Sequence, residues 1–153
     1  MKYKKRRRLK DYDYSSNGAY FITICTFDKI NYFWNSNLFK SSEQTVYTDA
    51  GHLICTAIEN IPSIYPSVMV DNYVIMPNHI HLILVLSEAN STVSNIVGQL
   101  KRQITLQLGF PIFQRSFHDH IIRNAQEYEQ IWNYIEDNPR KWNEDKYYLE
   151  TTM

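Results

Sequence analysis

The feature that most constrains the fold is an apolar stretch over residues 73–86, YVIMPNHIHLILVL, which is interrupted once at Pro77-Asn78. Proline lacks a backbone N–H and asparagine tolerates tight turns, so the pair interrupts a strand ladder. The stretch therefore predicts two strands that form an antiparallel hairpin. Successive side chains of a strand point to opposite faces, so His79 and His81 share one face, and the apolar residues that alternate with them point into a core.

Two imidazoles on one strand face are a candidate half of a divalent metal site. From the residue types alone, hydrogen-bonded structural histidines are an equally strong interpretation. His118 and His120 add a competitor, because they form a second His-x-His pair on another predicted strand. Spacing alone does not separate the two pairs, although the hydrophobic strand that follows His81 favours the first.

The zero net charge of the 153 residues hides an uneven distribution. Residues 1–10 contain seven basic and no acidic residues, whereas the remaining 143 residues carry 9 basic and 16 acidic groups. We therefore predict a basic N-terminal arm over residues 1–10 and one domain over residues 11–153. Such an arm attracts nucleic acid or an anionic surface, and a solvated tail is the alternative interpretation.

Several functional classes are disfavoured by the sequence. Cys25 and Cys55 lie in apolar surroundings typical of reduced core thiols, which predicts a cytoplasmic protein. The N-terminus lacks the apolar segment of a signal peptide, and no apolar run has the length of a membrane span. Only 4 glycines and no glycine-rich phosphate loop argue against a nucleoside-triphosphate or dinucleotide site.

The hydrophobic periodicity predicts four strands and three helices in the order strand, helix, strand, strand, helix, strand, helix. The strands are expected at 19–27, 68–76, 79–86 and about 117–122, and the helices at about 45–64, 93–108 and about 126–137. Ser91 or Thr92 is expected to cap the second helix and Gly109 to end it. This order predicts an α+β fold, a ferredoxin-like split βαβ antiparallel sheet with helices on one face and an added C-terminal helix.

The last predicted helix carries Tyr134 and Asn138, which are four residues apart and so lie on one helical face. A tyrosine hydroxyl can act as a nucleophile, and an asparagine carbonyl can ligate a hard cation. Taken alone the pair is weak evidence, since helix tyrosines commonly pack beside a core and an asparagine before proline commonly ends a helix.

Together, MPNHIH at residues 76–81 and YIEDNP at residues 134–139 resemble the motifs of the single-tyrosine HUH transposases. The chain is most similar to the REP-associated tyrosine transposase branch of the insertion-sequence-200-like group. FITICT at residues 21–26 and QRSFHDHIIR at residues 114–123 support the resemblance, which covers nearly the whole chain. The combination is much more specific than the HUH motif alone.

The resemblance implies a metal-dependent transposase that cleaves and rejoins single-stranded DNA at hairpin-associated sites through a 5′-phosphotyrosine intermediate. Carried over by motif position, Tyr134 is the nucleophile, and His79, His81 and Asn138 hold a divalent ion. Magnesium is favoured by its availability in the cell, with manganese as the other candidate. The resemblance also places His120 near the site, where it would assist the leaving group or bind DNA, although a structural or edge histidine is the favoured alternative.

The expected partner is single-stranded DNA with hairpin or palindromic structure, bound by a cytoplasmic, nucleoid-associated monomer or homodimer without a membrane contact. The predicted DNA-binding residues are basic: Arg6, Arg7, Arg8, Lys101, Arg102 and Arg115. One alternative is a catalytically retired module that binds structured nucleic acid. Another is a zinc-bound domain, which lacks a third ligand unless His118 or His120 contributes one.

Overall fold

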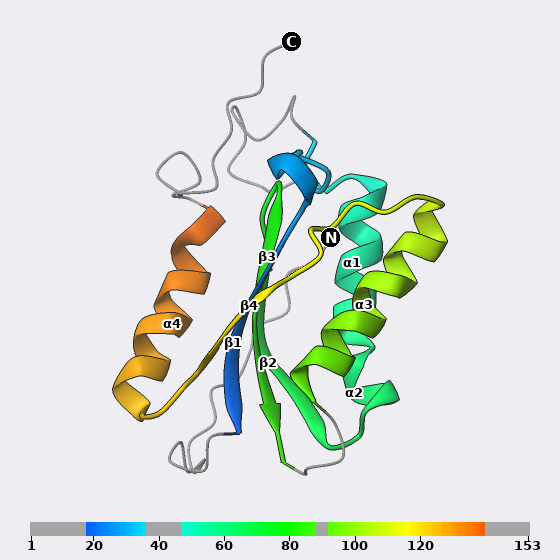
Figure 1. The fold of residues 1–153 in the computed structure, drawn as a ribbon. Helices are drawn as coiled ribbons and strands as arrows, with labels where there is room; N and C mark the ends of the chain where they lie inside the picture. Colours follow the sequence, from blue (N-terminus) through cyan, green and yellow to red (C-terminus); the bar gives the residue numbers. More distant parts are fainter. Residues whose placement is uncertain (1–17, 36–46, 88–91, 140–153) are drawn as a thin grey trace.

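The computed structural model describes residues 18–35, 47–87 and 92–139, and its centre is a four-stranded antiparallel sheet (Figure 1). The strands are β1 (Ala19–Cys25), β2 (Val68–Ile75), β3 (His79–Leu86) and β4 (His118–Ile121). They lie in the order β2-β3-β1-β4, and every neighbouring pair is antiparallel. This arrangement confirms the predicted ferredoxin-like sheet.

Helices cover both faces of the sheet (Figure 1). α1 (Asp49–Glu59) and α3 (Val93–Leu108) lie on one face, whereas α4 (Ala125–Asp137) lies against the other. The α1/α3 side is the face of helices expected from the split βαβ order, and α4 is the added C-terminal helix. The apolar core between the sheet and α1/α3 includes Ile80, Leu82 and Leu84 of β3, all of which are buried.

Local caps explain where the helices begin and end. The Thr92 hydroxyl accepts a hydrogen bond from the Asn95 N–H at the start of α3, and Gly109, with a φ of 87°, ends it. At α4, the side chain of Asn124 accepts from the Glu127 N–H. Each cap satisfies a backbone N–H that the helix itself leaves without a partner, and Gly109 adopts the left-handed conformation without steric cost.

Two predicted elements differ from the structure. The helix expected over residues 45–64 is divided into α1 and a short α2 (Ile61–Ile64), with Pro62 in the first turn of α2. Proline in the interior of one long helix would remove a hydrogen bond and clash with the preceding turn. The strand expected over 19–27 ends at Cys25, and the chain then forms the 3₁₀ turn η2 (Phe27–Lys29).

The sequence predicts no membrane span, and the helices within residues 18–35, 47–87 and 92–139 bear on that prediction. None of these helices combines the length and the apolar character that crossing a bilayer requires.

Candidate functional site

The two histidines of β3 lie on the sheet face that α4 covers. The strand register places His81 beside Thr23 and His79 beside Cys25 of β1. Both imidazoles are buried, and their ring centroids are 4.7 Å apart. The structure thus confirms that His79 and His81 share one face.

The Nδ1 atoms of both rings are held by neighbouring side chains. Asn78 donates through Nδ2 to the carbonyl of Lys29 at 3.2 Å, which turns its Oδ1 toward His79 Nδ1, 2.8 Å away. An acceptor at that position keeps the proton on Nδ1 and leaves the lone pair of the His79 ring on Nε2. Thr23 Oγ1 lies 2.9 Å from His81 Nδ1 and can hold that ring in the same tautomer. Outer hydrogen bonds of this kind orient histidines that bind metal.

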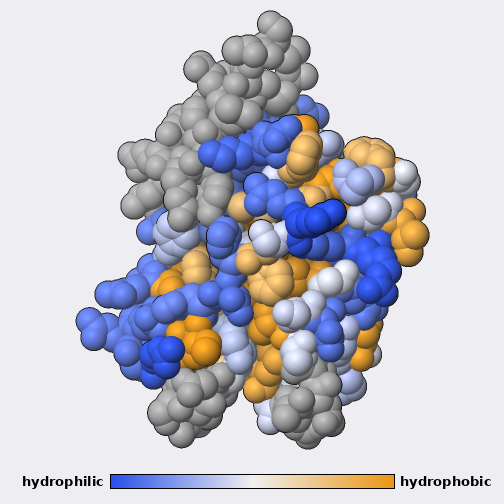
Figure 2. Space-filling view, viewed as in Figure 1, coloured by the Kyte–Doolittle hydropathy of each residue, from blue (hydrophilic) through white to orange (hydrophobic). Residues whose placement is uncertain are grey.

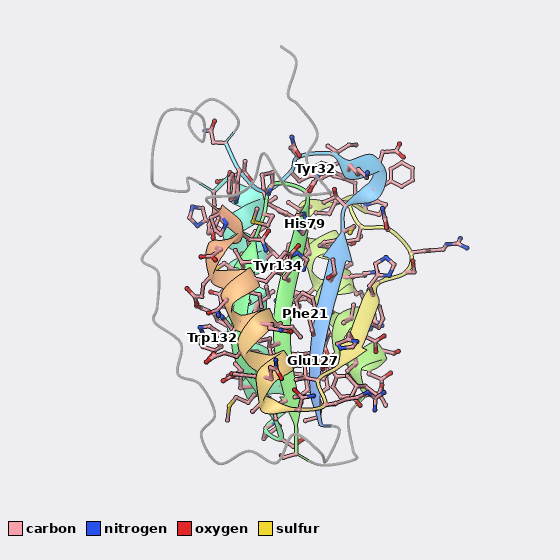
Figure 3. The ribbon with its side chains drawn as sticks, turned by 90° about the vertical axis from the view of Figure 1, so that its left-hand side faces the viewer. Phe21, Tyr32, His79, Glu127, Trp132 and Tyr134 are labelled. Atoms are coloured by element: carbon pink, nitrogen blue, oxygen red, sulfur yellow. The ribbon has the colours of Figure 1, made fainter. Side chains whose placement is uncertain are left out.

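Tyr134 approaches these histidines from α4 (Figure 3). Its ring centroid lies 5.2 Å from that of His81 and 6.2 Å from that of Phe21. The Phe21 ring in turn stacks on His81 at 5.2 Å. Because Tyr134 is 42% exposed while His81 is buried, the tyrosine lies at the boundary between the histidine pair and solvent.

Asn138 is the buried C-cap residue of α4. Its Nδ2 donates to the backbone carbonyl of Tyr134 at 2.7 Å, which fixes the amide orientation and identifies Oδ1 as the atom that a cation would use. Two imidazole nitrogens and one amide oxygen are a donor set that suits Mg²⁺ or Mn²⁺ only moderately well and favours no single metal. Within the described parts of the chain there is no group of three or more His, Cys, Asp or Glu residues with metal-site geometry.

Side-chain contacts tie α4 to both edges of the sheet. Near its start, Glu127 Oε2 lies 3.0 Å from His120 Nε2 of β4, and Glu127 Oε1 accepts from the Arg123 N–H at 2.9 Å. Near its end, Asn72 of β2 donates to Glu136 Oε1 at 3.2 Å. Since β4 and β2 are the two edge strands, α4 spans the width of the sheet, and Tyr134 lies between the two contacts.

The contacts of Glu127 predict a pH effect on stability. The hydrogen bond from His120 lowers the pKa of Glu127, helped by the Arg123 N–H and partly opposed by burial. A carboxylate with a lowered pKa stabilises the fold fully above its ordinary value and loses that contribution as the pH falls through the folded-state value. We expect wild type to be more stable than Glu127→Gln at neutral pH, and this difference to shrink below about pH 4. Urea unfolding across this pH range measures the difference in unfolding free energy, and Asp119→Asn on the exposed edge strand is the control. A difference between wild type and Glu127→Gln that does not depend on pH would contradict the role given to the Glu127 carboxylate.

The second His-x-His pair, His118 and His120, does not lie beside His79 and His81. His118 and His120 pair with Thr23 and Phe21 of β1, so they share the sheet face of His81 but lie two strands away from it. Both are exposed. Phe21, which contacts His81 and Tyr134, lies opposite His120, and the imidazole of His120 binds Glu127. A role of His120 at the leaving group stays a prediction.

The predicted DNA-binding residues fall into three groups. Arg6, Arg7 and Arg8 lie outside the described residues, and Arg102 and Arg115 are exposed. Lys101 is different, because its ammonium donates to three successive backbone carbonyls, of Gln114 at 2.7 Å and of Arg115 and Ser116 at 3.2 Å. Partial burial lowers the pKa of Lys101, an effect that Cys25 partly opposes. These contacts assign Lys101 a structural task, and its contact with DNA remains a prediction.

Removing the Lys101 ammonium should destabilise the segment before β4. Lys101→Met keeps the aliphatic stem but leaves three carbonyls to be solvated, and we expect a loss of about 1–2 kcal/mol after discounting for solvent exposure. Thermal unfolding measures this loss. Arg102→Met, the neighbouring exposed position, is the matched control, with an expected change of within about 0.5 kcal/mol. Equal effects of the two changes would contradict the structural assignment.

Sequence reasoning did not assign roles to Thr23, Phe21, Asn78 and Glu127. Thr23 and Phe21 contact partners more than 50 residues away, which the sheet and its packing against α4 bring together. Glu127 contacts His120 of β4, the strand that precedes its own helix. Asn78 was recognised as a turn residue, but its contact with the adjacent histidine was not. The Asn124-x-x-Glu127 spacing is a helix-start pattern, and it was the one available signal for Glu127.

Comparisons with known proteins show relatives in sequence and in structure. No protein-family model matches the chain. An uncharacterized protein from Haemophilus influenzae is 33% identical over 94% of this chain and 92% of its own length. A REP-associated tyrosine transposase from Escherichia coli is 34% identical over 73 residues, which is 47% of this chain and 44% of the relative.

Solved structures extend the similarity to almost the whole chain. A REP-associated tyrosine transposase bound to a REP hairpin aligns with 95% of this chain and 77% of its own, with a TM-score of 0.63 and 26% identity. A candidate transposase from Deinococcus radiodurans aligns with 86% of this chain and 96% of its own, with a TM-score of 0.53 and 14% identity, and shows the fold alone. The chain is therefore similar to the REP-associated tyrosine transposases of the insertion-sequence-200-like group, in sequence over about half of its length and in structure over almost all of it, which agrees with the resemblance found in its motifs.

Proposed function

We propose that this protein is a metal-dependent transposase that cleaves and rejoins single-stranded DNA beside a hairpin, through a covalent bond between Tyr134 and a 5′-phosphate. The observation that carries the proposal is the placement of Tyr134, half-exposed, 5.2 Å from the ring of His81. A nucleophile at the edge of a buried pair of imidazoles suits attack on a phosphate that enters from solvent.

In the proposed reaction, the Tyr134 hydroxyl loses its proton as its oxygen attacks the scissile phosphorus. The Oη–P bond forms, the bond between phosphorus and the 3′-oxygen breaks, and the 3′-oxygen leaves and takes up a proton. The products are a 5′-phosphotyrosine and a free 3′-hydroxyl. Attack by another 3′-hydroxyl reverses these steps and releases Tyr134, so the phosphodiester bond energy is conserved and no nucleotide cofactor is required.

His79, His81 and Asn138 would hold the divalent ion. When bound, the ion supplies Lewis-acid polarisation of the phosphate oxygens. The chain itself orients the ligands: Asn78 and Thr23 hold the imidazoles, and the contact of Asn138 with the Tyr134 carbonyl couples the ligand to the position of the nucleophile. The family relative bound to a REP hairpin supports hairpin DNA as the partner.

The test is to capture the covalent product. The full-length protein is incubated with labelled hairpin-bearing single-stranded DNA, with Mg²⁺ or with excess EDTA, and the products are separated in SDS. We expect an SDS-resistant adduct only with Mg²⁺, and mass spectrometry of its peptides should locate the nucleotide on Tyr134. A nucleotide on another residue would overturn the assignment, and tight DNA binding without any adduct would favour the non-cutting module.

A further inference from the structure

A loop at one end of the sheet encloses the turn that precedes the histidines. Residues 26–33 surround Pro77-Asn78 through four hydrogen bonds. The Thr26 N–H and hydroxyl both donate to the Asn78 carbonyl at 3.0 Å, Asn78 Nδ2 donates to the Lys29 carbonyl at 3.2 Å, and the Phe33 N–H donates to the Pro77 carbonyl at 3.0 Å. Since Asn78 also binds His79 Nδ1, its side chain connects the loop to the candidate metal site.

Two large apolar side chains of this loop are exposed to solvent, although Phe33 at its end is buried. Phe27 is 57% exposed and Ile30 is 42% exposed. Phe110, from the segment after α3, is 48% exposed, and its ring centroid is 6.3 Å from that of Tyr32. Figure 2 shows apolar side chains at the surface over η2 and over the loop that leaves α3. Exposed aromatic groups that gather beside a functional site indicate a binding surface.

The surface is built on a constrained backbone. The Phe27 N–H donates to the Ile112 carbonyl at 2.9 Å, and Thr26 pairs with Phe113, so the two loops that carry Phe27 and Phe110 are joined. Between Phe27 and Ile30, Asp28 and Lys29 have φ values of 54° and 57°, which non-glycine residues rarely adopt. Strained residues persist where surrounding contacts enforce them, and they occur preferentially at ligand-binding sites.

We propose that Phe27, Tyr32 and Phe110 form a stacking surface for unpaired bases of the DNA strand that enters the site, an inference that rests on the proposed function. Aromatic faces stack on any base, but only on bases that a duplex does not cover, so the surface suits the single strand beside a hairpin and not its stem. Its position favours this occupant, because Phe27 follows β1 two residues after Cys25, the register partner of His79.

The charges around the surface fit a nucleic acid strand. Lys29 lies within the loop and Arg115 lies two residues after Phe113, and both are exposed. Asp28 is the acidic neighbour within the loop, so the local balance is one positive charge in a chain whose residues 11–153 are acidic. Cations at the rim attract the phosphates while the rings bind the bases.

The experiment compares two DNA probes under conditions that prevent cleavage. One is a labelled hairpin with a blunt stem, and the other is the same hairpin with a single-stranded thymidine extension; affinities are measured at fixed salt in EDTA. Wild type should bind the extended probe more tightly. Phe27→Ala/Phe110→Ala should weaken binding of the extended probe by about 5-fold or more and leave the blunt probe unchanged.

Matched variants separate stacking from other effects. Met69→Ala removes an apolar side chain that is 46% exposed at the far end of the sheet, beside Val85, and should change neither affinity. Phe27→Tyr preserves the ring and should retain binding of the extended probe. Unchanged melting temperatures of all variants, expected for exposed positions, show that folding is intact.

Equal affinities of wild type and the double alanine variant for the extended probe would overturn the proposal. A double variant that sediments differently from wild type but binds DNA equally well would also overturn it, and would assign the surface to a second copy of the chain. The adduct assay separates this outcome from failure of the proposed function. The double variant should still form the Tyr134 adduct at saturating DNA. A wild type that discriminates between the probes but forms no adduct would support the stacking surface and reject the cleavage chemistry.

Discussion

Tyr134→Phe should abolish the covalent protein–DNA adduct, lowering its yield by about a thousandfold or more. The change removes only the hydroxyl that would form the bond to phosphorus. The phenyl ring that contacts His81 and Phe21 is kept, so packing and DNA affinity should change little. Adduct formation is measured in SDS gels with labelled hairpin DNA and Mg²⁺, and binding is measured separately in EDTA.

Tyr128→Phe is the matched control for this change. Tyr128 lies on the same helix but is buried, so its hydroxyl is not accessible to a DNA phosphate. The control should retain the adduct even if it loses some stability. If Tyr134→Phe still forms the adduct, Tyr134 is not the nucleophile. The assignment also fails if a folded Tyr128→Phe protein forms no adduct.

His79→Ala should remove cleavage while largely sparing DNA affinity. The imidazole is fully buried and is oriented by Asn78, so its proposed task is to hold the ion and not to contact bases. Binding of Mn²⁺ in the absence of DNA, followed by electron paramagnetic resonance, should weaken by at least about 10-fold. Truncation of a buried ring also costs about 1–3 kcal/mol of stability, so thermal unfolding must accompany the assay.

His52→Ala serves as the control, because His52 is an exposed histidine of α1 on the opposite side of the sheet. It should retain Mn²⁺ binding, cleavage and DNA affinity. If a folded His79→Ala protein binds Mn²⁺ as wild type does, the histidine pair is structural, and the metal assignment fails even if activity is reduced.

Local signals were sufficient for many elements of the fold. β3 begins and ends as predicted, at His79 and Leu86, because Pro77-Asn78 and the end of the apolar run define it. α3 also matches, because Thr92 caps it and Gly109 ends it. The α1/α2 break was missed because the apolar spacing continues through Ile58 and Ile61, although Pro62 carried the signal.

The assembly of the site depends on information that no local pattern carries. Alternation predicts that His79 and His81 share a face, but the register that brings Thr23 beside His81 is a pairing over 58 residues. The apolar side of α4 shows that the helix packs on something without indicating which sheet face it covers. Likewise, the charge of Lys101 is visible in the sequence, whereas its three carbonyl partners are not.

The short connection between β4 and α4 has a consequence for reaction order. Only residues 122–124 separate Ile121 from Ala125, which lie at most about 14 Å apart, so the tyrosine helix starts at the edge of its own sheet. One chain thereby contains the histidine pair and the nucleophile together. At saturating DNA, the fraction of protein converted to adduct per unit time should then stay constant as the protein is diluted. A rate that falls with dilution would instead indicate that two chains must meet before either can cut.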